Sequence, residues 1–177
     1  MELAITAIGA DRPGVVAAVT GALADLDCNL ADTSMTILGG RFAMVLIVSA
    51  PDGTDAGTVA AALAGPAATL GLDVAVHPSA PTDSAPSTGT PWSVAVYGAD
   101  RPGIVHRVAA TLADLGVNIT DLTTRVIGDR AHPVYAMLLE VALPVGLEGG
   151  VLEERLRGVA AELGVDCSAH PVDVDVL

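Results

Sequence analysis

Apolar residues along the first half of the chain follow two spacings, and these distinguish helices from strands. Val15, Val19 and Leu23 recur at the spacing of one helix face. Short apolar runs bounded by glycine, proline or aspartate are typical of strands. The predicted elements are a strand at 3–8, a helix at 13–26, strands at 30–37 and 42–48, a helix at 55–70 and a strand at 74–77. Gly65 and Pro66 predict a kink or a break in the second helix, because proline removes a backbone hydrogen bond.

The second half of the chain repeats this order. Gly9 corresponds to Gly98, an offset of 89 residues, and after Arg41 the offset becomes 93. The four additional residues of the second half lie around Ala131 to Val134, where proline predicts a longer hairpin connection. Between the halves, Ser, Pro, Thr and Gly dominate, which is linker composition. The sequence therefore predicts a first domain at 1–78, a linker at 79–91 and a second domain at 92–177.

Each half has the order βαββαβ within about 80 residues, which is the ferredoxin-like arrangement. The predicted fold class is α+β: two units, each a four-stranded antiparallel sheet with two helices on one face. Polar residues at alternate positions of 30–37 predict an edge strand, whereas 42–48, apolar on both faces, should be central. The face without helices is expected to be apolar enough for another sheet or subunit to cover part of it; it carries Ala4, Thr6, Ile8, Ala43, Val45 and Ile47.

Charge and hydropathy narrow the function classes. The formal net charge is -13, with eight arginines and no lysine, which argues against nucleic acid as a partner. No apolar run approaches the roughly 18 residues of a membrane span. The N-terminus has no signal-like segment, so we expect a cytoplasmic protein without a membrane partner. Cys28 and Cys167 stand at non-equivalent positions within apolar stretches, which favours buried thiols over a disulfide or metal pair.

One chemically distinctive loop occurs in both halves: residues 9–14, from Gly9 to Gly14, return as residues 98–103. Each copy lies between a predicted strand and a predicted helix, with proline placed in the first helical turn. Free N–H groups at a helix start attract a carboxylate, and an aspartate can accept from an ammonium group, so the loop could bind a zwitterionic amino acid. Alternatively, Asp11 and Asp100 only cap the helix and the arginines pair with acidic neighbours. The residues leave both interpretations open.

Other chemistry has weaker support. Val15 and Ile104 stand where a phosphate-binding loop needs lysine, and no hydrolase, zinc-protease or paired-cysteine motif occurs. Of the four histidines only His106 lies near a motif, either beside a ligand or as a solvated helix residue. We therefore expect no catalytic residue, no metal, no cofactor and no enzyme activity.

The repeated Asp-Arg-Pro-Gly loop, the order βαββαβ and the segment from Leu115 to Leu122 resemble the ACT domain, a small module that binds amino acids. Two copies with little else resemble stand-alone tandem ACT proteins, among them the glycine cleavage system transcriptional repressor-like group. The resemblance implies that ACT units pair side by side, with ligands at the seam between the loop after the first strand and the start of the second. Carried to this chain, it implies ligand contacts from Asp11, Arg12, Pro13, Gly14, Asn29 and Leu30, and from Asp100, Arg101, Pro102, Gly103, Asn118 and Ile119.

The two implied sites differ at the turn before the second strand. Asp27 stands in the first half where Gly116 stands in the second, so the first site is expected to be altered in shape. Asn29 and Asn118 could equally be turn residues without a ligand role. The second site is therefore favoured.

Two function classes follow. The first is a regulatory protein that senses a small amino acid and signals through association with itself or a protein partner. The second is a protein-interaction module of the same fold without a ligand. In either case the apolar sheet face and the polar edge strands predict a homodimer or higher homo-oligomer.

Overall fold

The computed structural model describes residues 1–79, 89–127 and 133–172, and the chain divides into two compact units at 1–83 and 84–177. Most of the predicted linker, residues 80–88, lies outside the described residues. So do residues 128–132, which include most of the predicted hairpin insertion.

The first unit has the element order β1, α1, β2, β3, α2, β4. Its elements are β1 (Glu2–Ala10), α1 (Val15–Ala24), β2 (Asn29–Leu38), β3 (Arg41–Ser49), α2 (Ala56–Leu70) and β4 (Leu72–Pro78). All strand pairs are antiparallel, in the order β2-β3-β1-β4. The predicted ferredoxin-like order is confirmed, with β2 at an edge and β3 inside the sheet.

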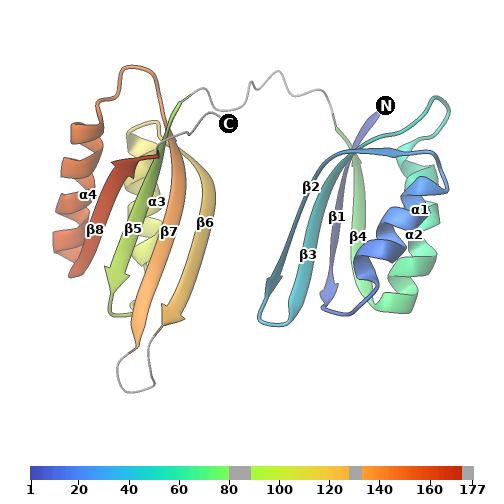
Figure 1. Cartoon of the computed structure of the whole chain (residues 1–177), viewed down its shortest axis with the longest axis horizontal. Helices are drawn as coiled ribbons and strands as arrows, with labels where there is room; N and C mark the ends of the chain where they lie inside the picture. Colours follow the sequence, from blue (N-terminus) through green and yellow to red (C-terminus); the bar gives the residue numbers. More distant parts are fainter. Residues whose placement is uncertain (80–88, 128–132, 173–177) are drawn as a thin grey trace. The chain divides into compact units, whose positions relative to one another are not determined.

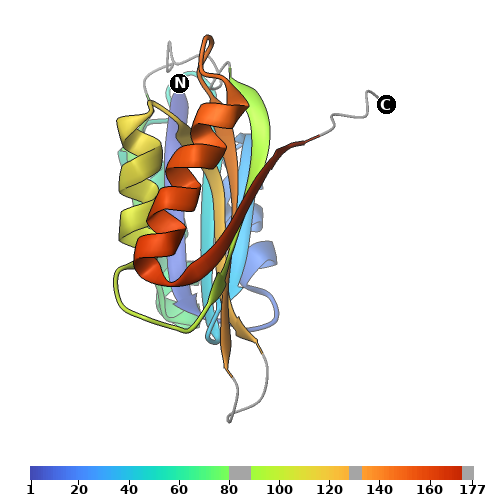
Figure 2. The same cartoon turned by 90° about the vertical axis from the view of Figure 1, so that its left-hand side faces the viewer.

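The second unit repeats the arrangement. Its elements are β5 (Thr90–Gly98), α3 (Ile104–Asp114), β6 (Asn118–Ile127), β7 (Val134–Leu143), α4 (Gly149–Leu163) and β8 (Val165–Pro171), with strand order β6-β7-β5-β8. Thr90 and Pro91, which the sequence assigned to the linker, already pair with Leu143 and Ala142. In each unit both helices lie on one face of its own sheet (Figure 1), and Figure 2 shows α3 and α4 side by side in front of theirs.

Alternation along the strands separates the core from the open face. In β1, Leu3, Ile5 and Ala7 are fully buried beneath the helices, where they pack with residues such as Val19 and Leu23. The intervening residues face away from the helices, as predicted. On that open face Ile8 is 52% exposed and Val45 is 49% exposed within the unit.

The helices differ from their predicted form in two respects. The first helix begins at Val15, so Pro13 precedes the helix and does not stand in its first turn. The second helix continues through Pro66 to Leu70, so the predicted break is absent. Tertiary packing of its buried residues Val59 and Leu63 on the sheet outweighs the one backbone bond that proline removes. No helix in the described ranges is long and apolar enough to cross a membrane.

Candidate functional site

Both repeated loops are built on a proline-glycine turn that leads into the helix. Gly14 has φ 93° and ψ -8°, and Gly103 has φ 96° and ψ -6°. These angles are those of the third residue of a type II turn, which favours proline before it and glycine at that position. In the first unit the turn is closed by Val15, whose N–H donates to the carbonyl oxygen of Arg12 at 3.5 Å.

The starts of α1 and α3 lack a side-chain cap, so the interpretation of Asp11 and Asp100 as capping residues is wrong. The N-cap positions are Gly14 and Gly103, and at neither helix start does a backbone N–H group donate to a capping side chain. The type II turn places each aspartate three residues before the N-cap, too far along the chain for the usual capping bond. The first N–H groups of α1 and α3 therefore have no partner within the helix and no side-chain cap.

A groove of about 460 Å³ opens at the second loop. It brings together three of the predicted residues, Asp100, Arg101 and Gly103, with the first turn of α3. Pro102 belongs to the same turn but does not line the groove. The groove is lined by Asp100, Arg101, Gly103, Ile104, Val105, His106 and Tyr135. Because residues 104–106 are the first turn of α3, a carboxylate in the groove would lie beside free N–H groups and the positive end of the helix dipole.

Tyr135 is a lining residue that the sequence did not predict. It lies on β7 opposite Gly98, 34 residues along the chain from Arg101, and is 8% exposed. Burial raises the pKa of its hydroxyl, the neighbouring Thr124 hydroxyl opposes the rise, and the negative charge of Asp100 adds to it. One sequence signal could have found it: Tyr135 takes the place of Phe42 in the aligned halves.

Arg101 has a structural contact besides its place in the groove. Its Nη1 donates to the carbonyl oxygen of Leu163 at 3.4 Å, at the last turn of α4. A cation at a helix C-terminus interacts favourably with the helix dipole and satisfies a carbonyl that lacks a helical partner. At least one of its donors therefore holds the loop against α4.

The first loop has the same backbone but different surroundings. The N–H of Asp11 donates to the carbonyl oxygen of Gly40 at 3.1 Å, which ties the loop to the β2–β3 turn. Phe42, 1% exposed, stands where the second unit has Tyr135, and Ala17 stands where it has His106. The first loop thus lacks counterparts of two polar side chains that line the second groove, Tyr135 and His106.

The starts of β2 and β6 lie far from the loops of their own units. Asn118 pairs with Ala142, which also pairs with Pro91, whereas the loop begins beyond Gly98. Gly98 lies seven residue steps beyond Pro91 in β5, roughly 24 Å along the strand. Within one unit, therefore, Asn118 and Ile119 do not reach the loop. The strand pairing of the first unit has the same register, so Asn29 and Leu30 do not reach its loop either.

The turn before the second strand is alike in both units, contrary to the expected difference in shape. Asp27 has φ 53° and Gly116 has φ 69°, and the N–H of the next residue donates to Leu23 in one unit and to Leu112 in the other. Aspartate adopts this left-handed conformation more readily than most residues because its short polar side chain can bond locally. Gly116 is therefore no reason to favour the second site.

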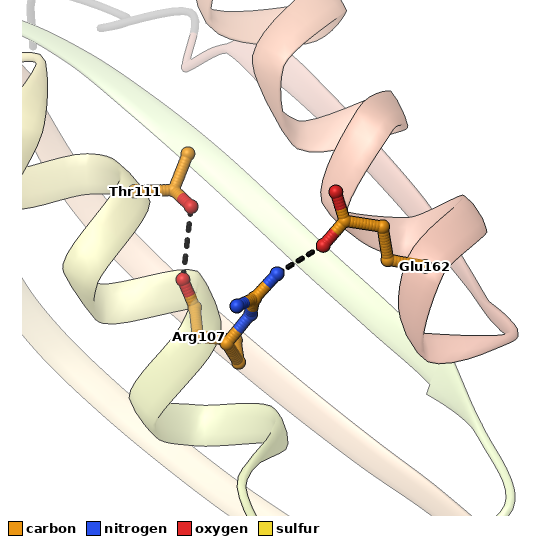
Figure 3. A network of polar contacts seen from close by, with 3 residues as sticks. All are labelled: Arg107, Thr111 and Glu162. Carbon is orange, nitrogen blue, oxygen red and sulfur yellow. Dashed lines mark hydrogen bonds and ion pairs between the residues drawn. The ribbon is translucent and has the colours of Figure 1, made fainter.

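Two further cavities are larger than the groove at the second loop. One of about 690 Å³ lies between α3 and α4, where Arg107 forms an ion pair with Glu162 (Figure 3). Both side chains are more than half exposed, so solvent screening makes this pair weak. The other, of about 480 Å³, lies on the open sheet face and includes Asp121, Arg125 and Glu140. The first of these cavities shares His106 with the groove at the second loop, whereas the second is lined by strand residues only.

The described residues contain no candidate metal site, since no group of three His, Cys, Asp or Glu side chains among them could hold an ion. Cys28 and Cys167 are free thiols, the first buried and the second partly buried. Burial raises the pKa of Cys167 to about 11, which keeps the thiol protonated at neutral pH.

Comparison with protein families places both units in one family. ACT domain models match residues 2–77 and residues 92–148. The chain belongs to the ACT domain family. It contains two ACT domains, as the repeated loop and the order βαββαβ predicted.

Relatives extend along nearly the whole chain. The phosphoserine phosphatase SerB2 of Mycobacterium tuberculosis is 35% identical over 178 residues, which are 96% of this chain but 41% of that protein. The glycine cleavage system transcriptional repressor of Escherichia coli is 25% identical over 174 residues, 97% of this chain and 90% of the repressor. This tandem ACT chain thus spans about two fifths of the length of the phosphatase and most of the length of the repressor.

A solved structure shows the same fold over the whole chain. A protein of unknown function from Galdieria sulphuraria has a TM-score of 0.81 with 29% identity, covering 97% of this chain and 98% of that one. This tandem ACT chain therefore shares its fold with that protein over nearly the whole length of both.

Proposed function

We propose that this tandem ACT chain is a regulatory protein that senses a free amino acid at the second loop. The observation that carries the proposal is the groove in which the Asp100 carboxylate and the uncapped first turn of α3 lie together. A zwitterion requires an acceptor for its ammonium group and donors for its carboxylate. Asp100 supplies the first, and the N–H groups of residues 104–106 supply the second.

The signal is proposed to pass through association of the chain with itself. The edge strands β2 and β6 present unpaired backbone groups, and exposed apolar residues such as Leu122 and Val126 lie along β6. A two-fold axis between two copies of β6 makes them antiparallel, so that the start of one strand lies beside the end of the other. In such a dimer Asn118 and Ile119 of one copy approach the loop end of its partner, which is how they could contact a ligand.

The test compares the amino acids as stabilisers of the full chain. A ligand at one hundred times its Kd stabilises the native state by about 2.7 kcal/mol, which for a unit of 60–100 residues corresponds to a rise of roughly 11–22 °C in Tm. Asp100→Ala should reduce this rise, whereas Asp73→Ala, which removes an exposed carboxylate of the first unit far from the second loop along the chain, should leave it unchanged.

The alternative function is an ACT module that only binds protein. The observation in its favour is the open sheet face, where Ile8 and Val45 are about half exposed. A panel of the twenty amino acids that leaves the Tm of the wild-type chain unchanged would favour this alternative. A shift that Asp100→Ala does not alter would show that a ligand binds elsewhere.

A further inference from the structure

The two ACT units differ in the polarity of the groups around their loops. Tyr135 and His106 line the groove of the second unit, and the aligned residues of the first unit are Phe42 and Ala17. Thr124, whose hydroxyl opposes the rise in the pKa of Tyr135, is aligned with Met35. At each of these three positions, the second unit thus has a polar side chain where the first unit has an apolar one.

Packing alone does not explain the hydroxyl of Tyr135. Phe42 fills the equivalent place beneath α1 and is 1% exposed, so a phenyl ring is sufficient for the core of this fold. Tyr135 lines the groove, so its hydroxyl is available to hydrogen-bond with a bound ligand.

His106 lines the same groove from the first turn of α3, and the residue is exposed. Its imidazole can donate or accept a hydrogen bond. Asp100 and the free N–H groups of α3 are engaged by the ammonium and carboxylate groups in the proposed function. Tyr135 and His106 are then left to contact the side chain of the ligand.

We infer that the second groove selects amino acids whose side chain carries a hydroxyl or carboxamide group, with Tyr135 and His106 as its hydrogen-bond partners. This inference rests on the proposed function. The first loop, with Phe42 and Ala17 in the same places, lacks this selectivity.

The experiment measures Kd by calorimetry for matched amino acids with the full chain. Threonine and valine have nearly the same shape, and so do asparagine and leucine, but only one of each pair offers hydrogen bonds. One additional net hydrogen bond corresponds to a few-fold to about tenfold tighter binding. We expect threonine or asparagine to bind tighter than its apolar counterpart by that factor.

The variants are chosen to preserve the fold. Tyr135→Phe reproduces the residue of the first unit and should abolish the preference while leaving affinity for the apolar amino acid unchanged. His106→Ala changes an exposed residue and should reduce the preference. Tyr97→Phe is the matched control, because Tyr97 is the other tyrosine of the chain and is exposed on the open sheet face; the preference should persist in it.

Each outcome decides one point. If no amino acid binds the wild-type chain, the proposed function is wrong and the inference falls with it. If amino acids bind without preference within the matched pairs, only the inference is overturned. If the preference persists in both Tyr135→Phe and His106→Ala, these residues are not its source and the inference is likewise overturned.

Discussion

Gly103 provides a direct test of the turn that forms the second groove. Its φ of 96° lies in the left-handed region, and a Cβ built on it meets no atom within 4 Å. The cost of Gly103→Ala is therefore backbone strain without steric overlap. For a residue with a Cβ this strain is about 1–2 kcal/mol.

This free energy predicts a measurable change in Tm. A loss of 1 kcal/mol lowers the Tm of a domain of 60–100 residues by roughly 4–8 °C, and each ACT unit is of that size. Gly103→Ala should therefore lower the melting transition of the second unit by about 4–16 °C in a calorimetric scan. The strained turn should also re-aim the first N–H groups of α3 and diminish the Tm shift caused by an amino acid.

Two further variants separate strain from other effects. Gly103→Asn should be milder than Gly103→Ala, because asparagine adopts the left-handed conformation more readily. Gly158→Ala lies within α4, also in open space, and should raise stability by about 0.5–1 kcal/mol because alanine is the better helix residue. If Gly103→Ala melts like the wild-type chain, or if alanine and asparagine cost the same there, the type II turn does not control this loop.

Three other predictions concern packing, pH and charge. Gly98→Ala places a Cβ 2.7 Å from Val165 Cγ1 and 3.2 Å from Val165 Cα, so overpacking should cost about 1–3 kcal/mol in denaturant unfolding, and a wild-type midpoint would contradict this. Burial raises the pKa of Cys167 from 9.0 to about 11, so its contribution to the free energy of unfolding is present below pH 9 and is lost as the pH rises towards 11. Cys167→Ala should flatten that part of the profile of stability against pH, and an unchanged profile would be contrary evidence. The chain carries a net charge of -13 and should not retard duplex DNA in a gel at near-physiological salt; salt-sensitive retardation would refute this.

The order of strands and helices was predictable because it occurs twice. Alternation in the strands and helical spacing at Val15, Val19 and Leu23 gave the core, and the second copy provided an independent check on each element. The errors are local. Pro66 remains inside α2 because the packing of a whole helix face outweighs a single missing bond, which no short window of sequence reveals.

The candidate site was predictable only where it is contiguous in the sequence. Asp100, Arg101 and Gly103 were found because the loop is repeated, but Tyr135 comes from a strand that reaches the loop through sheet pairing. The capping interpretation failed for a geometric reason: a glycine with positive φ occupies the N-cap position itself. The contact of Arg101 with Leu163 depends on how α4 ends, which the loop sequence does not contain.

The two loops show how a duplicated backbone can serve sites of different chemistry. Proline and glycine fix the turn in both units, and Asp27 even reproduces the left-handed turn of Gly116, so the frame is the same. The differences lie in side chains that the frame does not require: Tyr135 in place of Phe42 and His106 in place of Ala17. Since the first unit folds with the apolar residues, the polar ones add nothing that the fold needs. Their position around one groove is therefore better explained by what the groove binds than by what holds the unit together.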